Sequence, residues 1–184
     1  MGIRFFNFSS TIHATVIITV LPYLRWKKSD DCNLSQIGRH HNISNLSKDI
    51  ENIYEVRLSL EVLALEKSFD SLDQNILLDL KEKYINLEKK FSWEIARKLD
   101  EDFHNYFINK ANNETLSEIL IKLNKQVSVY RTIASKDPNR SEKTIKEHMK
   151  IIEAISKKDK AKAIESLKIH LNSVKKSAIE ASLM

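Results

Sequence analysis

Side chains that commonly bind metal ions interrupt the apolar helical stripes of this sequence at three places. Asp100 and His104 form an Asp-x-x-x-His pair, whose spacing puts both side chains on one face of a helix. His148 and His170 each replace an apolar residue within a later stripe. The other three of the six histidines lie near the N-terminus: His13, His40 and His41. If the first four groups converge in the fold, they would form a metal site with room for a further ligand.

For one such histidine alone, a core imidazole bonded to a backbone carbonyl is the simpler interpretation. For three histidines and an aspartate together this interpretation weakens, because four buried polar groups would need partners in one small volume. A metal ion satisfies them together, with neutral imidazole nitrogens and an ionised carboxylate as ligands. Zinc, nickel, manganese, iron and cobalt all suit this ligand set, which does not choose between them.

An arginine also stands on an apolar stripe, between Ile53 and Leu60. Arg57 can hold the carboxylate of a ligand through two parallel hydrogen bonds. It can equally pair with Glu61, one helical turn further on, and the pattern does not decide between these roles. Arg131 is a weaker candidate for a ligand contact, and we expect its side chain to be solvated.

The composition favours long helices joined by short connections. Of 184 residues, two are glycine and two are proline, too few for the many turns of a β-rich fold. The formal charge of +5 comes from lysines interspersed with acidic residues, as on solvated helix faces, and does not indicate nucleic-acid binding. The single cysteine, Cys32, cannot form an internal disulfide, so we expect a cytoplasmic protein.

Hydrophobic periodicity predicts helices from residue 46 onward, and therefore an all-α fold. The predicted helices are 46–67, 72–90, 93–110, 114–134, 142–156 and 160–181. Four residues are expected to cap helix starts: Ser71, Asn113, Ser141 and Asp159. The segment 137–139, Asp-Pro-Asn, is expected to form a turn.

Residues 1–45 differ in character, and we assign them no fold. Their apolar run, 12–24, is shorter than the roughly 20 residues of a membrane-spanning helix. A strand, an interfacial segment and a weak signal peptide are the alternatives for it. The gap between Gly38 and Ile43 is too long for the tight turn of a helix-turn-helix, so we expect no DNA-reading head here. The predicted domains are 1–45, without an assigned fold, and 46–184.

Five segments of the helical part carry a resemblance to a known family. In chain order they are Tyr54-Glu-Val-Arg57-Leu-Ser-Leu-Glu61, Leu99-Asp100-Glu-Asp-Phe103-His104, Ala111-Asn-Asn113-Glu-Thr-Leu116, Glu147-His148-Met-Lys-Ile-Ile-Glu-Ala-Ile155, and Lys158-Asp159-Lys-Ala-Lys-Ala163 followed by His170-Leu171. In order and spacing they resemble the sensor domain called FCD, from the FadR branch of GntR-type bacterial transcription regulators. The resemblance covers about three quarters of the chain, from about residue 46 to 181.

The resemblance implies an antiparallel helical bundle in which an aspartate and three histidines hold a divalent ion at the floor of a cavity. The family's ligand positions map onto Asp100, His104, His148 and His170. Its helix-one arginine, which helps to bind a small organic acid, maps onto Arg57. The resemblance further implies a homodimer whose affinity for operator DNA changes when a carboxylate effector binds. We favour zinc, nickel or manganese as the metal.

Residues 1–45 depart from this family, whose members carry a winged helix-turn-helix before the sensor. We therefore expect operator binding only where a DNA-binding head is supplied, and no membrane partner. Two other functions stay open. One is a metal-dependent, hydrolase-like enzyme, although no general base stands beside the predicted site and we expect no enzyme. The other is a structural helical module in which the histidines are packed without metal.

Overall fold

The computed structural model describes residues 43–134 and 137–183, and this part of the chain is helical. The helices are α3 (Ile43–Ser68), α4 (Gln74–Lys89), α5 (Trp93–Lys110), α6 (Glu114–Ala134), α7 (Pro138–Ser156) and α8 (Lys160–Ser182), with a short 3-10 helix, η1 (Phe69–Ser71), before α4. The described residues contain no strand, so the predicted all-α bundle of about six helices is confirmed. The interpretations of the 12–24 run, Cys32 and the three N-terminal histidines concern residues outside the described part.

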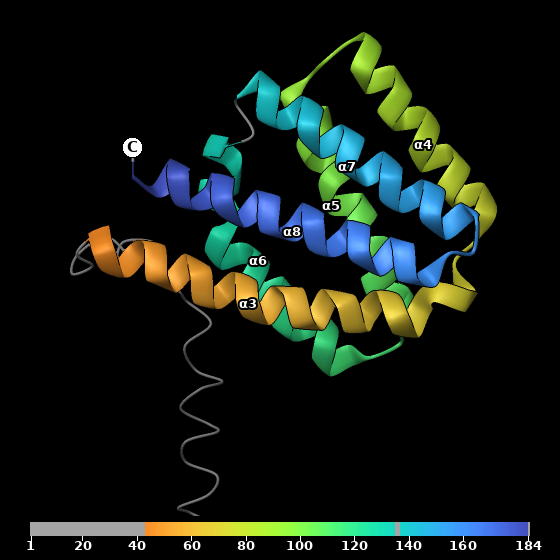
Figure 1. Cartoon of the computed structure of the whole chain (residues 1–184), viewed down its shortest axis with the longest axis horizontal. Helices are drawn as coiled ribbons and strands as arrows, with labels where there is room; N and C mark the ends of the chain where they lie inside the picture. Colours follow the sequence, from red (N-terminus) through yellow and green to blue (C-terminus); the bar gives the residue numbers. More distant parts are fainter. Residues whose placement is uncertain (1–42, 135–136, 184) are drawn as a thin grey trace, which may run out of the picture. The chain divides into compact units, whose positions relative to one another are not determined.

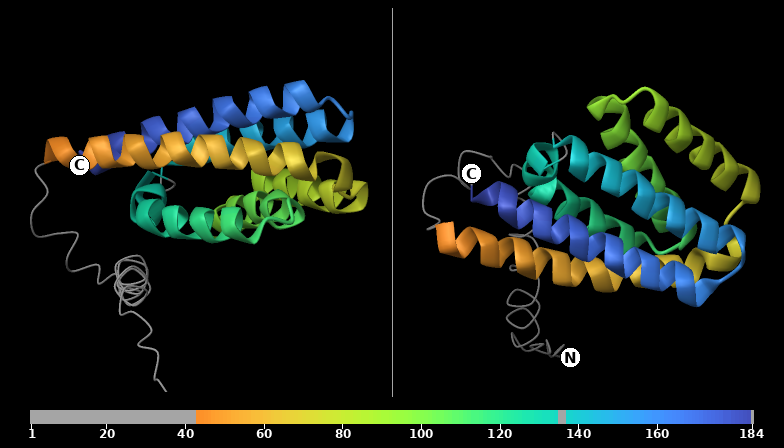
Figure 2. Two further views of the ribbon diagram at one scale, coloured as in Figure 1. Left: turned by 90° about the horizontal axis from the view of Figure 1, so that it is seen from below. Right: turned by 45° about the horizontal axis from the view of Figure 1, so that its top comes forward.

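The helices form two layers (Figures 1 and 2). In one layer α8 lies between α3 and α7. In the other, α5 and α6 pack against α3, α6 also packs against α8, and α4 lies beside α7. Helices α3 and α8 are antiparallel, because Ser47 Oγ near the start of α3 lies 3.5 Å from Ser182 Oγ at the end of α8. The layers bring α5, α7 and α8 together, although they are far apart in sequence.

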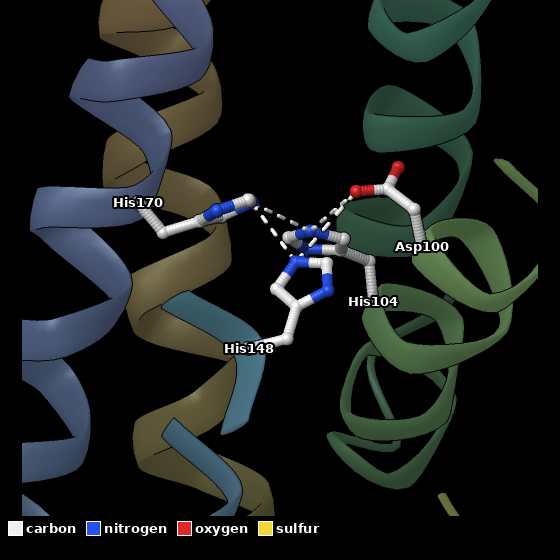
Figure 3. Close-up of side chains that lie close together, drawn as sticks. All are labelled: Asp100, His104, His148 and His170. Carbon is white, nitrogen blue, oxygen red and sulfur yellow. Dashed lines mark hydrogen bonds and ion pairs between the residues drawn. The ribbon is translucent and has the colours of Figure 1, made fainter. Parts of the chain in front are cut away.

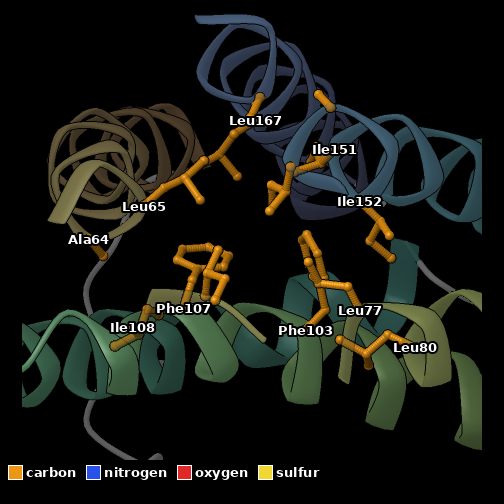
Figure 4. Packing of buried hydrophobic residues seen from close by; sticks show 14 of the residues in the cluster. Ala64, Leu65, Leu77, Leu80, Phe103, Phe107, Ile108, Ile151, Ile152 and Leu167 are labelled. Carbon is orange, nitrogen blue, oxygen red and sulfur yellow. The ribbon is translucent and has the colours of Figure 1, made fainter. Parts of the chain in front are cut away.

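An apolar core fills the space between the layers, as Figure 4 shows. Leu65 and Leu167 approach from the first layer and Phe103 and Phe107 from α5, all at most 1% exposed. The stripes that predicted the helices are therefore the surfaces that meet. Among the described residues, no helix has both the length and the hydrophobicity of a membrane span.

Two of the predicted caps are confirmed. Asn113 Oδ1 accepts from the backbone N–H of Leu116 at 3.1 Å, and Asp159 Oδ1 accepts from that of Lys162 at 2.9 Å. The Asn113 amide and the Asp159 carboxylate each satisfy a backbone N–H group that a helix start leaves without a partner.

The other two predicted caps, Ser71 and Ser141, are wrong. The cap of α4 is Asp73, whose Oδ1 accepts from Asn75 N–H, while Ser71 lies in η1. Helix α7 begins at Pro138, capped by Asp137, so residues 137–139 are a helix start and not a separate turn. Proline fits the first helical position because it has no N–H to satisfy there.

Candidate metal-binding site

Asp100, His104, His148 and His170 meet where α5, α7 and α8 come together (Figure 3). One potential ligand atom from each residue lies within 4.8 Å of the others. The three histidines are at most 3% exposed, whereas the Asp100 side chain retains 14%. The structure therefore unites the four residues that the sequence singled out, each on the buried face predicted for it.

The Nδ1 atom of each histidine has its own hydrogen-bond partner outside the cluster. His104 Nδ1 lies 2.6 Å from Glu61 Oε2, and His170 Nδ1 lies 2.9 Å from Glu147 Oε2. An ionised carboxylate only accepts, so both Nδ1 atoms carry the proton and donate it.

The same holds for His148, whose Nδ1 lies 2.7 Å from the hydroxyl of Tyr84. That hydroxyl donates to the carbonyl of Leu99 at 3.1 Å, so it accepts from His148. Burial raises the pKa of Tyr84, with a further contribution from Asp102, and keeps the hydroxyl protonated.

With the Nδ1 atoms bonded to these groups, the Nε2 atoms of the three rings meet at the centre of the cluster. His170 Nε2 lies 3.2 Å from His104 Nε2 and 3.1 Å from His148 Nε2. A proton on the Nε2 atom of His148 or His170 is disfavoured, because burial, followed by the neighbouring histidines, lowers the pKa of both residues well below 6.5. The Nε2 atoms of His148 and His170 thus present two lone pairs to each other at 3.1 Å, an arrangement that a cation relieves.

Glu61 links this cluster to Arg57. Arg57 Nη2 donates to Glu61 Oε1 at 2.6 Å and Nε donates to the same oxygen at 3.1 Å, with both side chains at most 1% exposed. Burial alone would raise the pKa of Glu61, but His104 and Arg57 together hold it well below its ordinary value. Of the two roles considered for Arg57, the ion pair with Glu61 is present. Its Nη1 is buried with no hydrogen-bond partner among the described residues, and a ligand contact stays a prediction.

The expectation of a solvated Arg131 is wrong. Its side chain, on α6, is 22% exposed, and Nη2 donates to Asp100 Oδ2. Arg140 on α7, which the sequence reasoning did not single out, pairs with Glu147 Oε2 at 3.3 Å. Each end of the histidine cluster is therefore bordered by an arginine paired with a carboxylate.

A cavity of about 310 Å³ adjoins the cluster, within the size range of small-molecule sites. Asp100 and His104 belong to its wall, and Arg57 does not. Four cations line it, namely Arg97, Lys125, Arg131 and Arg140, against two carboxylates, Asp100 and Glu101. This excess of positive charge suits an anionic occupant.

Comparisons with known proteins agree on one family. The model of the FCD domain matches residues 52–173. The uncharacterized HTH-type transcriptional regulator YdhC of Bacillus subtilis (strain 168) is 30% identical over 150 residues, covering 79% of this chain and 64% of that protein. The metal-free FCD domain of the protein TM0439 superposes with a TM-score of 0.65 at 31% identity, over 73% of this chain and 94% of the other.

Proposed function

Because the chain belongs to the FCD domain family, we propose that it is the effector-sensing domain of a GntR/FadR-type transcriptional regulator. In this proposal Asp100, His104, His148 and His170 bind a divalent metal ion, with zinc, nickel and manganese favoured. A small organic acid occupies the adjoining cavity. Occupancy of the two sites modulates DNA binding, and none of these residues is assigned a catalytic role.

The convergence of three Nε2 atoms carries the metal proposal. Glu61, Tyr84 and Glu147 each bond the Nδ1 atom of one ring and so turn its Nε2 atom toward the cluster. Asp100 adds a carboxylate oxygen, Oδ1, at 3.6 Å from His148 Nε2. A bound divalent ion would supply a positive charge at the cavity wall, to which a carboxylate is attracted.

The charge of the cavity wall supports the acid proposal. Its four cationic side chains outnumber its two carboxylates. The resemblance assigns the acid contact to Arg57, and the buried, unpartnered Nη1 of this residue leaves that assignment open. In the structure, Arg57 lies behind Glu61 and outside the cavity wall, so a direct contact requires Arg57 to reorient.

The partners follow from the family in the same way. The chain spans 64% of the length of YdhC, which is an HTH-type regulator by its description. We propose that the domain acts as a homodimer and reaches operator DNA where a DNA-binding head is supplied. Its partners are then a small carboxylate and DNA.

The metal proposal is tested by elemental analysis of the untagged protein, before and after dialysis against a chelator, with a thermal melt of each. We expect near-stoichiometric divalent metal and a lower melting temperature after stripping. An ion at 100 times its Kd stabilises the folded state by about 2.7 kcal/mol. Absence of metal, with a melt indifferent to added zinc, nickel or manganese, would favour the structural module with dry histidines.

A pair of variants on α8 assigns the site. His170→Ala removes one of four ligands and should lower metal occupancy strongly, whereas Asn172→Ala, at an exposed position two residues on, should not. Equal occupancy in the two variants would argue against the assignment. Metal-dependent turnover that is lost in His148→Ala would instead favour the enzyme alternative.

A further inference from the structure

The two carboxylate oxygens of Asp100 face different surroundings. Oδ1 is turned toward the histidines, 3.6 Å from His148 Nε2 and 3.8 Å from His104 Nε2 (Figure 3). Oδ2 accepts from Nη2 of Arg131. One carboxylate therefore joins the histidine cluster on α5, α7 and α8 to a guanidinium on α6.

Arg131 stands between this carboxylate and the cavity. It lines the cavity, and its partly exposed side chain offers more donors than the one that Asp100 accepts. A planar guanidinium can hold a second carboxylate through parallel N–H bonds. Arg57, in contrast, has its Nε and Nη2 committed to Glu61, away from the cavity wall.

We propose that Arg131 couples the two ligands, so that metal at the histidine cluster strengthens the binding of a carboxylate in the cavity, and the acid strengthens the binding of metal. This inference rests on the proposed function and adds the residue through which its two sites communicate.

The sign of the coupling follows from charge. Without metal, Asp100 and Arg131 neutralise each other, and a carboxylate approaching Arg131 must compete with Asp100. When Asp100 shares its charge with a divalent cation, its hold on Arg131 weakens and the guanidinium is available to the acid. An acid on Arg131 in turn leaves Asp100 to the cation, and thermodynamic linkage makes the two enhancements equal.

The experiment measures the zinc affinity of the metal-stripped protein by competition with a chromophoric chelator, with and without succinate. The chelator reports free zinc, so the weak zinc–succinate complex is accounted for. Succinamide serves as the uncharged control. We expect succinate, and not succinamide, to raise zinc affinity within the usual range of allosteric coupling, roughly 5- to 150-fold.

Three variants assign the coupling. Arg131→Gln should reduce the enhancement by succinate to less than about twofold, near the limit of no coupling. Arg131→Lys keeps the charge without the planar fork and should retain an intermediate enhancement. Arg97→Gln removes an exposed cation from the same cavity wall and should retain most of the enhancement. Zinc affinity without succinate should be unchanged or higher in Arg131→Gln, because a competing cation has been removed.

Three results would overturn this inference alone. Full enhancement in Arg131→Gln would make its pair with Asp100 incidental to the coupling. A large loss of zinc affinity in Arg131→Gln without succinate would show that Arg131 only positions Asp100. Wild-type protein that binds zinc and succinate independently would also refute the coupling while leaving the proposed function intact. Wild-type protein that binds no zinc would overturn both.

Discussion

Two regions of the interior lie side by side and are built on different principles. Around Phe103 and Phe107, apolar side chains fill the space between the layers (Figure 4). Beside them, the histidines belong to chains of directed hydrogen bonds. His148 borders both, since its ring lies 4.5 Å from that of Phe103, centroid to centroid. In the apolar region a substitution removes contacts in proportion to its size. In the polar region a substitution leaves a buried charge or lone pair without its partner, so the loss of stability depends on which group is left unpaired.

The largest effect is expected at the charged end of the polar region. Arg57→Ala leaves Glu61 fully buried without its cation, and removing one partner of a buried ion pair costs about 3–5 kcal/mol. Urea denaturation of the metal-stripped variant measures this loss. In the matched control, Lys157→Ala breaks an exposed pair with Glu153 at the same spacing and should have little effect.

Arg57→Ala is expected to be poorly folded, so a second variant keeps the prediction testable. Adding Glu61→Gln removes the buried charge and should recover part of the lost stability. If both variants match the wild type in stability, the buried ion pair contributes nothing, and the contrast between the two regions fails.

The next effect concerns pH and should also separate the two regions. His148 and His170 have folded-state pKa values well below the ordinary 6.5, so the unfolded chain binds more protons in acid. The stability of the metal-stripped protein should therefore fall as the pH drops below about 6.5, by about 1.4 kcal/mol per pH unit for each histidine. Urea midpoints at pH 7.5 and 5.5 measure the slope. It should be smaller in His148→Gln and unchanged in Ile152→Val, and an unchanged slope in both would count against neutral buried imidazoles.

A smaller and simpler effect is expected in the apolar region. Ile152→Val deletes one methylene group from a core position 1% exposed, which typically costs about 0.5–1.5 kcal/mol. The loss of stability should be the same with and without added metal, because the Ile152 side chain takes no part in the hydrogen-bond chains of the histidine cluster. A metal-dependent loss would show that the two regions are not energetically separate.

The smallest effect should come from the connector between α7 and α8, outside both regions. Lys158 has φ 58°, in the left-handed region that glycine adopts without a steric penalty. We expect Lys158→Gly to leave stability unchanged or raise it by up to about 1 kcal/mol. A thermal melt beside Lys157→Ala checks this, and a marked destabilisation would mean that Lys158 makes a contact that offsets the strain.

The fold was predictable from the sequence because each long stripe has one interpretation as a helix. The errors lie at the helix ends, where two polar residues compete to cap. Asp73, not Ser71, caps α4, and Asp137, not Ser141, caps α7. For α7, the proline after Asp137 was the sequence signal that the helix begins there. The domain boundary at residue 46 stays a prediction, although α3 begins at Ile43.

The four cluster residues could be chosen because a polar residue in an apolar stripe is visible in the sequence. Their partners could not, since periodicity shows that a side chain is buried but not what it meets. Tyr84 is 64 positions from His148, and Glu147 is 23 from His170. Arg131 was misjudged for the same reason, because its partner Asp100 is 31 positions away on another helix.

The uneven exposure of the four cluster residues has a consequence for rates. His148 and His170 are sealed within the bundle, and only Asp100 and His104 belong to the cavity wall. An ion held by this cluster would face the cavity at Asp100 and His104, where an organic acid would also bind. An acid in that place would cover the ion on the cavity side. It would lengthen the residence time of the ion without a new contact to it, so the domain could keep its metal through a brief fall in the supply.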